Sequence, residues 1–430
     1  MDRREFVRTG LATGALAGTS RAAGAPQLGA APKFGTGGIL DAGVWEQQEL
    51  MAAGKLTSHS LTSQYLARIK TIVNAVIEIN PEALKIALEM DRERKLKRLR
   101  GPLHGIPVLL KDNISTADRM STSAGPLALP GARAERDAHV AERLRAAGAV
   151  IIGKTNLGDW VRLGGGDTAG AGEAAGRKPR AAISSSAGPA IAAGLATLAI
   201  GTETNGAILS PASNCGLVGI KPTLGLVSRS GIIPLAPMAD TAGPMARSVT
   251  DAALTLWAIA GTDPADPATE ATAGQVVDYR MALEKGGLRG ARIGVARALS
   301  DREPELDAVI EKALLDLTAQ GAVLIELAMP VNGEGGTEPL DAAIDSAMRE
   351  HGLDALVAPT GSGLPSQAAM AGYPHITVPA GHVHGAPVGL SFVGAAYSEA
   401  ALIRMAYSYE QATQHRRAPQ FPASVSFAAR

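Results

Sequence analysis

The stretch His139-Val-Ala-Glu-Arg-Leu-Arg-Ala-Ala-Gly-Ala-Val-Ile-Ile-Gly153 indicates the fold class of this chain. Residues 139–147 have the periodicity of a helix, whereas residues 148–153 form a short apolar run of the kind found in buried strands. Gly148 stands where a glycine commonly ends a helix, so the chain is expected to pass directly from helix to strand. This order of helix, glycine and strand is typical of an α/β domain.

The same alternation continues along the chain on both sides of this stretch. Apolar runs predict strands at 106–111, 291–296, 323–327, 355–359, 376–380 and 388–393, with a turn at 381–385 before the last one. Helical periodicity predicts helices at 45–75, 81–99, 250–260, 305–320, 340–349 and 399–413, and residues 184–201 read as a helix followed by a strand. No internal repeat or clear linker interrupts the pattern, so residues 40–430 are predicted to form a single domain.

Composition limits the classes of function. The 430 residues carry 41 Lys+Arg and 41 Asp+Glu, so no net charge attracts nucleic acid, and none is expected as a partner. The apolar fraction of 46% is ample for a large core. The single cysteine excludes an intrachain disulfide and a cysteine-based zinc site. Two histidines, His382 and His384, have alternating spacing, but we interpret them as part of a hairpin turn.

The first residues, Met1-Asp-Arg-Arg-Glu-Phe-Val-Arg8, place an arginine pair before a mildly apolar stretch, and Ala23-Gly24-Ala25 follows as a candidate cleavage site. Residues 1–25 therefore resemble a twin-arginine export signal, which predicts a periplasmic location. The alternative is a disordered basic N-terminus. The stretch is too short and too weakly apolar for a stable membrane anchor.

Six segments, in this order, resemble the amidase-signature family, and the resemblance covers most of the chain after residue 45. They are Gly101–Asn113, Gly153–Asn156, Gly201–Gly206, Gly216–Thr223, Asp240–Ser248 and Gly385–Phe392. Within the family the chain looks most like bacterial peptide amidases. The resemblance implies a mixed β-sheet core covered by helices on both faces. It also implies hydrolysis of small or C-terminal peptide amides, with no cofactor and no metal.

The family's reaction uses a serine nucleophile, a second serine in a cis peptide bond and a buried lysine base. A serine hydroxyl needs a base to remove its proton, and a lysine can be that base only where burial disfavours its charge. Backbone N–H groups in the turn before the nucleophile stabilise the oxyanion. The resemblance assigns the base to Lys111 and the oxyanion turn to Thr204, Asn205 and Gly206, which leaves Ala207 at the nucleophile position.

Three features depart from the family pattern. The methyl group of Ala207 has no proton to lose, so acyl-enzyme chemistry cannot start there; Ser210, three residues on, is a weak alternative nucleophile. Counting back from Ala207 places Ile183 at the bridging serine, whereas a slip of one residue places Ser184 there. The family's long insertion after Pro330 is replaced by a short polar loop at residues 331–338, which predicts a more open pocket.

Two functions therefore stay open. The first is an amidase-type C–N hydrolase of linear amides that follows the Ser–cis-Ser–Lys scheme despite Ala207. The second is a catalytically inactive amidase-like protein, a pseudoenzyme by nature or by engineering, that binds amide ligands or a partner. In either case, Lys111 and the turn Thr204–Gly206 match the family pattern.

Overall fold

The protein is described by a computed structural model that covers residues 38–71, 75–123, 132–157, 187–236, 239–296, 303–327 and 340–419. All of these residues lie in one compact unit, Phe34–Arg430. The predicted export signal at residues 1–25 and both candidates for the bridging serine, Ile183 and Ser184, lie outside the described residues. They stay predictions.

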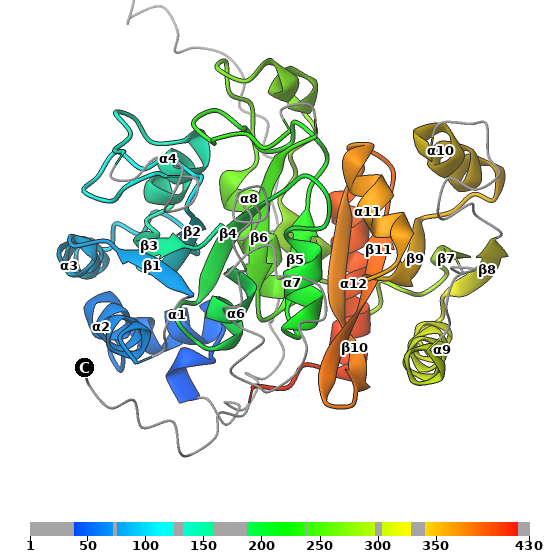
Figure 1. Cartoon of the computed structure of the whole chain (residues 1–430). Coiled ribbons are helices and arrows are strands. Elements are labelled where there is room, and N and C mark those ends of the chain that lie inside the picture. Colours follow the sequence, from blue (N-terminus) through cyan, green and yellow to red (C-terminus); the bar gives the residue numbers. More distant parts are fainter. Residues whose placement is uncertain are drawn as a thin grey trace, which may run out of the picture. The chain divides into compact units, whose positions relative to one another are not determined.

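The described residues build one sheet of eleven strands in the order β1-β3-β2-β4-β6-β5-β10-β11-β9-β7-β8 (Figure 1). Strand β2 is parallel to β3 and β4, and β7 is parallel to β8 and β9, whereas the other neighbours are antiparallel. The strands are β1 (Val76–Ile79), β2 (Pro107–Lys111), β3 (Val150–Thr155), β4 (Leu198–Glu203), β5 (Val218–Lys221), β6 (Thr241–Ala246), β7 (Arg292–Ala296), β8 (Val323–Leu327), β9 (Ala355–Pro359), β10 (His375–Val383) and β11 (Ala386–Val393).

Helices cover both faces of this sheet, and the predicted mixed α/β architecture is confirmed. Figure 1 shows α6 and α7 on one face and α8 and α12 on the other. The described helices are α1 (Val44–Ala52), α2 (Ser58–Ile69), α3 (Ala83–Lys95), α4 (His139–Ala146), α6 (Ala187–Ala192), α7 (Leu209–Asn214), α8 (Val249–Ile259), α9 (Pro304–Ala319), α10 (Leu340–Glu350), α11 (Gly363–Met370) and α12 (Glu399–Thr413). Short 3-10 turns lie at Gly38–Leu40, Pro267–Thr272 and Tyr279–Ala282.

Two of the differences between the structure and the predicted elements have a clear local cause. Residues 45–75 form two helices, because Gly54 turns the chain with φ +69° and Thr57 starts α2 by accepting the Ser60 N–H at 3.0 Å. The predicted turn at 381–385 is shorter, since β10 continues to Val383 and His384 alone takes the left-handed conformation before Gly385.

The central strands β2, β3 and β4 are buried along their whole length. Strands with both faces covered are continuous apolar runs rather than alternating ones, which explains the sequence pattern at 106–111 and 148–153. Because these three strands are parallel neighbours, their carboxyl ends meet at one edge of the sheet. Ligand sites in α/β sheets commonly lie at that edge.

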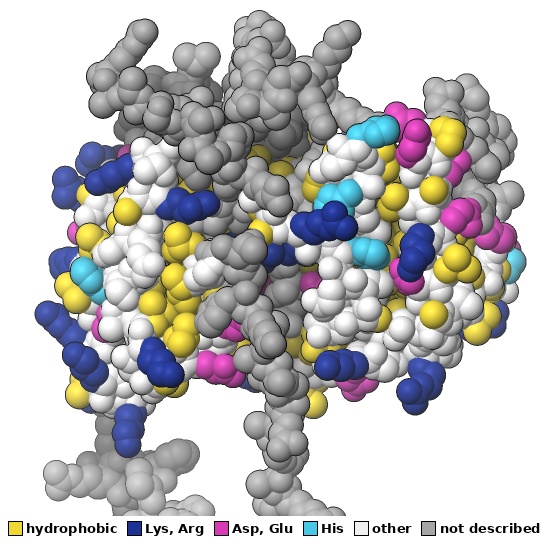
Figure 2. Space-filling model, turned by 90° about the horizontal axis from the view of Figure 1, so that it is seen from below, with side chains coloured by type: hydrophobic (Ala, Val, Ile, Leu, Met, Phe, Trp, Pro, Cys, Tyr) yellow, Lys and Arg dark blue, Asp and Glu magenta, His cyan; other side chains and the backbone are white. Residues whose placement is uncertain are grey.

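The surface carries mixed charge. Over the described residues of the face in Figure 2, basic, acidic and apolar side chains are interspersed, without a continuous area of one sign. Among the described helices, none is both long enough and apolar enough to cross a bilayer.

We predict that Gly148→Ala destabilises the fold more than Gly54→Ala does. Both glycines have a positive φ, +79° at Gly148 and +69° at Gly54. A Cβ on Gly148 would lie 2.8 Å from Nδ1 of His104, whereas a Cβ on Gly54 would have no other heavy atom within 4 Å. We expect a loss of about 1 kcal/mol for Gly54→Ala and about 3 kcal/mol for Gly148→Ala in the free energy of unfolding, measured by urea denaturation. Equal losses would mean that backbone strain alone requires Gly148.

Candidate active site

Lys111 ends β2 at the sheet edge where β4 also ends. Residues Val108 to Leu110 of β2 pair in parallel with Leu198 to Ile200 of β4. The Lys111 side chain is fully buried, and its Nζ donates to the carbonyl oxygen of Thr202 at 3.1 Å. The predicted base position and the segment that leads into the predicted oxyanion turn are therefore in direct contact.

The residues that follow Lys111 hold this contact in place. Asn113 Nδ2 donates to Thr202 Oγ1 at 3.2 Å and to the carbonyl oxygen of Ile233 at 3.1 Å. The Asp112 carboxylate accepts the Ser123 hydroxyl at 2.6 Å. Both side chains are buried, so these hydrogen bonds form in a medium where an unpaired polar group would be costly.

A second buried lysine, Lys154 on β3, belongs to the opposite face of the sheet. Its register partner on β2 is Leu110, whereas Lys111 pairs with Thr155, and successive side chains of a strand point to opposite faces. Burial lowers the pKa of Lys154 to about 8, and its Nζ donates to the carbonyl oxygen of Ile114. Of these two lysines, Lys111 is the one placed beside the turn after β4.

The turn Thr204–Ala207 connects β4 to α7. Gly206 has a φ of +79°, a backbone conformation that residues other than glycine rarely adopt. The Thr204 hydroxyl donates to the Asp240 carboxylate, and the Ser366 hydroxyl donates to Oδ1 of Asn205. Two side chains from distant parts of the chain thus hold the turn from outside.

Glu203, the last residue of β4, holds the turn from inside. Its Oε2 accepts the backbone N–H groups of Ile208 at 2.7 Å and Leu209 at 3.0 Å, at the start of α7. Its Oε1 lies 3.0 Å from Nε2 of His375 on β10, and both side chains are fully buried. The Glu203 carboxylate therefore joins the end of β4 to the start of α7, and also to β10 in another part of the sheet.

The protonation states of this pair follow from its surroundings. Burial acts to raise the pKa of Glu203, but the hydrogen bonds from His375, Ile208 and Leu209 outweigh it, so the pKa is lowered. Burial lowers the pKa of His375 more than the hydrogen bond and negative charge of Glu203 raise it, and the nearby positive charge of Lys221 adds to the lowering. The pair is thus an ionised carboxylate that accepts a hydrogen bond from a neutral imidazole.

At the predicted nucleophile position the structure has a buried methyl group, that of Ala207. Ser210 lies in the first turn of α7, and its Oγ is 3.0 Å from where a Cβ on Gly206 would be. Among the described residues, no basic side chain forms a hydrogen bond with the Ser210 hydroxyl, which an activated serine needs.

A cavity of about 240 Å³ opens beside this site. Thr202 and Asp240 line it, and these residues contact Lys111 and Thr204 respectively. Arg229 and Asp266, also in its wall, pair with each other at 2.7 Å. Among the described residues, no group of three His, Cys, Asp or Glu side chains could hold a metal ion.

Several supporting residues could not be assigned from the sequence. Glu203 and Asp240 belong to segments that match the family pattern, but the pattern does not say what they contact. His375 and Ser366 carry no motif signal at all. His375 is 172 residues from Glu203 in the chain, and only the sheet order brings the two together.

We predict that Glu203→Ala destabilises the protein by about 3–5 kcal/mol, because it leaves buried N–H groups without an acceptor. Glu203→Gln should cost only about 1–2 kcal/mol. Its carbonyl oxygen can accept both backbone N–H groups while its amide donates to the other tautomer of His375. Urea denaturation of both variants compares the two losses, and equal losses would contradict this account.

The pH dependence of stability offers a second test. Because the pKa of His375 is lowered in the folded state, the unfolded chain binds a proton first as the pH falls through about 6.5, and stability decreases. His375→Gln removes this difference, so its free energy of unfolding should fall less steeply between pH 7.5 and 5.5, by at most about 1.4 kcal/mol per pH unit. The exposed His351→Gln is the control, and an unchanged slope in His375→Gln would refute the neutral imidazole.

Comparisons with known proteins identify the family of the chain. The sequence model of the Amidase family matches residues 60–335. The probable amidase At4g34880 of Arabidopsis thaliana is 35% identical over 459 residues, covering 85% of this chain and 89% of that protein. The structure of native peptide amidase from Stenotrophomonas maltophilia is 41% identical with a TM-score of 0.78, covering 88% of this chain and 98% of that one. The chain therefore belongs to the amidase family, a family of C–N bond hydrolases.

Proposed function

We propose that this protein is an amidase-type C–N hydrolase for linear amides, with the C-terminal amide of a peptide as its substrate class. The amide carbonyl would lie at the turn Thr204–Ala207, where backbone N–H groups can donate to a developing oxyanion. Lys111 would act as the base, through a serine of the segment that holds Ile183 and Ser184. The substrate class rests on the 41% identity to a solved peptide amidase.

One observation carries the proposal. The fully buried Lys111 donates at 3.1 Å to the carbonyl oxygen of Thr202, two residues before the turn. A base and an oxyanion turn from separate parts of the sequence are therefore close together in a water-poor site. In such surroundings both proton transfer and electrostatic stabilisation are more effective than in water.

Ala207 favours a second candidate function, a catalytically inactive protein that binds amides. A methyl group cannot attack a carbonyl, whereas the backbone N–H groups of the turn do not depend on the side chain at position 207. The hydrogen bonds that hold the turn come from Glu203, Asp240 and Ser366, and none involves Ala207. Amide binding can therefore persist where acyl transfer cannot.

The test measures ammonia release from a panel of linear amides that includes peptide amides, with the full chain and with Ala207→Ser. In the proposed hydrolase, water activated by Lys111 attacks the amide carbon and ammonia leaves, so we expect slow ammonia release from peptide amides by the unaltered chain and faster release, through an acyl-enzyme, by Ala207→Ser. Lys111→Ala in the Ala207→Ser background should reduce the rate by about 10²–10⁴-fold, as loss of a catalytic base does. Calorimetric titration of a peptide amide against the matching peptide acid measures binding separately.

The outcomes separate the two candidates. Turnover by the unaltered chain that is lost in Lys111→Ala would contradict the inactive protein. Restored activity in Ala207→Ser would indicate that Ser184 is the bridging serine, because Ile183 cannot relay a proton. Binding of the amide without turnover by any variant would favour the inactive protein, and no binding would refute the amide site itself.

A further inference from the structure

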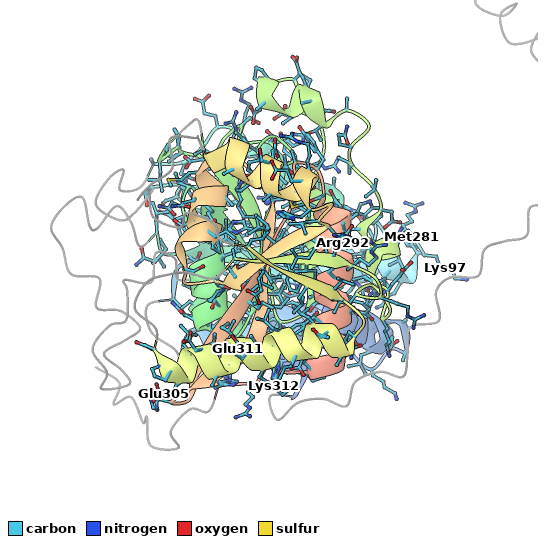
Figure 3. The ribbon with its side chains drawn as sticks, turned by 90° about the vertical axis from the view of Figure 1, so that its right-hand side faces the viewer. Lys97, Met281, Arg292, Glu305, Glu311 and Lys312 are labelled. Atoms are coloured by element: carbon cyan, nitrogen blue, oxygen red, sulfur yellow. The ribbon has the colours of Figure 1, made fainter. Side chains whose placement is uncertain are left out.

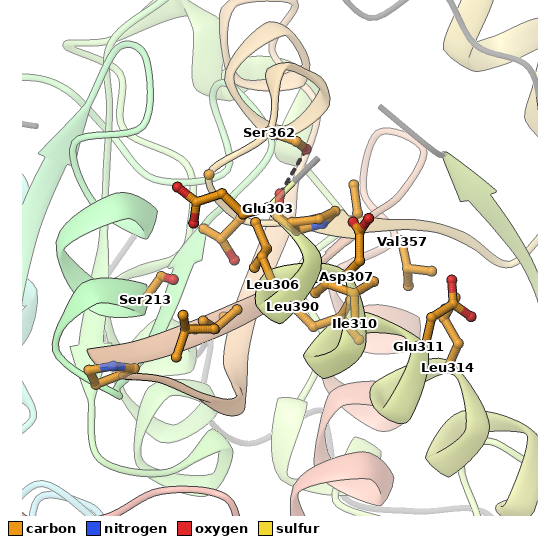
Figure 4. Close-up of a pocket in the computed structure, with 18 of the residues that line it drawn as sticks. Ser213, Glu303, Leu306, Asp307, Ile310, Glu311, Leu314, Val357, Ser362 and Leu390 are labelled. Atoms are coloured by element: carbon orange, nitrogen blue, oxygen red, sulfur yellow. Dashed lines mark hydrogen bonds between the residues drawn. The ribbon is translucent and has the colours of Figure 1, made fainter. Parts of the chain in front are cut away.

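A second cavity, of about 520 Å³, lies between α7, α9 and the strands β9 and β11 (Figure 4). Its volume is typical of sites for small molecules, which occupy roughly 300–1,000 Å³. Neither Lys111 nor the turn Thr204–Ala207 lines it. The described residues that the proposed amide hydrolysis uses therefore lie outside the cavity wall.

Helix α9 contributes two parallel rows of side chains to the wall. Residues four apart lie on the same side of a helix. One row is apolar and consists of Leu306, Ile310 and Leu314; the other is acidic and consists of Glu303, Asp307 and Glu311. Val357 and Leu390 of the sheet lie across from α9 and extend the apolar surface. The cavity thus combines a hydrocarbon wall with carboxylates of one helix.

The charged residues in the described part of the cavity wall are all acidic. Among its described lining residues there is no lysine, arginine or histidine. Glu303 and Glu311 have other interactions. The contact with a ligand's charge is therefore assigned to Asp307. Figure 3 shows Glu305 and Lys312 on the side of α9 away from Glu311. The positive charge of Lys312 is therefore directed away from the cavity wall.

Ser213 of α7 provides an independent observation. Its side chain is only 7% exposed, it lines the cavity, and Figure 4 shows it directed toward α9. Within the described part of the chain its hydroxyl has no hydrogen-bond partner. Because the residue is largely buried and its hydroxyl faces the cavity, this hydroxyl is available to a polar group that enters the cavity.

We infer that this cavity is a binding site for an aliphatic amine. The hydrocarbon part of the ligand contacts the apolar row of α9, its ammonium group pairs with Asp307, and a second polar group bonds to Ser213. Burial of the hydrocarbon part supplies binding free energy, while the carboxylate selects the charge. This inference does not depend on the proposed amide hydrolysis.

The proposed amine site can be tested by calorimetric titration of the full chain with 1,6-diaminohexane at pH 7 and low salt. The neutral 1,6-hexanediol has nearly the same shape and should bind at least about fivefold more weakly. Asp307→Asn should weaken diamine binding about three- to fivefold, and Ser213→Ala about threefold. Glu305→Gln is the matched control, because it removes an exposed carboxylate of the same helix outside the cavity and should change nothing.

Three results would overturn the inference. They are no diamine binding to the folded chain, equal binding of diol and diamine, and an equal loss in Glu305→Gln and Asp307→Asn. Circular dichroism of each variant verifies the fold, and both site substitutions are close in size to the residues they replace. Increasing salt should weaken the diamine but not the diol, since only the diamine is held by charge.

Discussion

The buried carboxylate of Glu203 is the constraint on which the rest of the site depends. A buried carboxylate costs several kcal/mol unless its oxygens are hydrogen-bonded, and here Ile208, Leu209 and His375 supply three N–H groups. In the sheet, two strands separate β4 from β10, so this one group connects the start of α7 to the other half of the sheet. The turn Thr204–Ala207 can adopt only the path that keeps these bonds.

This arrangement separates the scaffold from the chemistry. The turn is held by Glu203, by Asp240 through Thr204, and by Ser366 through Asn205, while position 207 contributes no side-chain hydrogen bond. A methyl group instead of a hydroxyl at position 207, the predicted nucleophile position, therefore leaves every one of these bonds in place. The amidase fold can therefore keep the shape of the turn Thr204–Ala207 with alanine at position 207.

The second cavity shows the same independence in another part of the molecule. Its wall is formed by α7, α9, β9 and β11, and Lys111 is not among its lining residues. A ligand can therefore bind there without contacting Lys111. Because α7 begins just after the turn Thr204–Ala207, the proposed amide site and the second cavity share one helix. Its first turn carries Ser210, which lines the cavity and lies over Gly206.

The sequence by itself determined the α/β class, the family and the positions of Lys111 and of the turn after β4, because these depend on local periodicity and on short motifs. It did not determine the break at Gly54, since a helical pattern can continue across a glycine that the chain uses as a turn. Only the tertiary structure decided that Lys111, and not Lys154, lies beside the turn, because strand register sets the side of the sheet. It also decided the roles of His375 and Ser366, whose contacts join residues far apart in the chain and leave no local pattern.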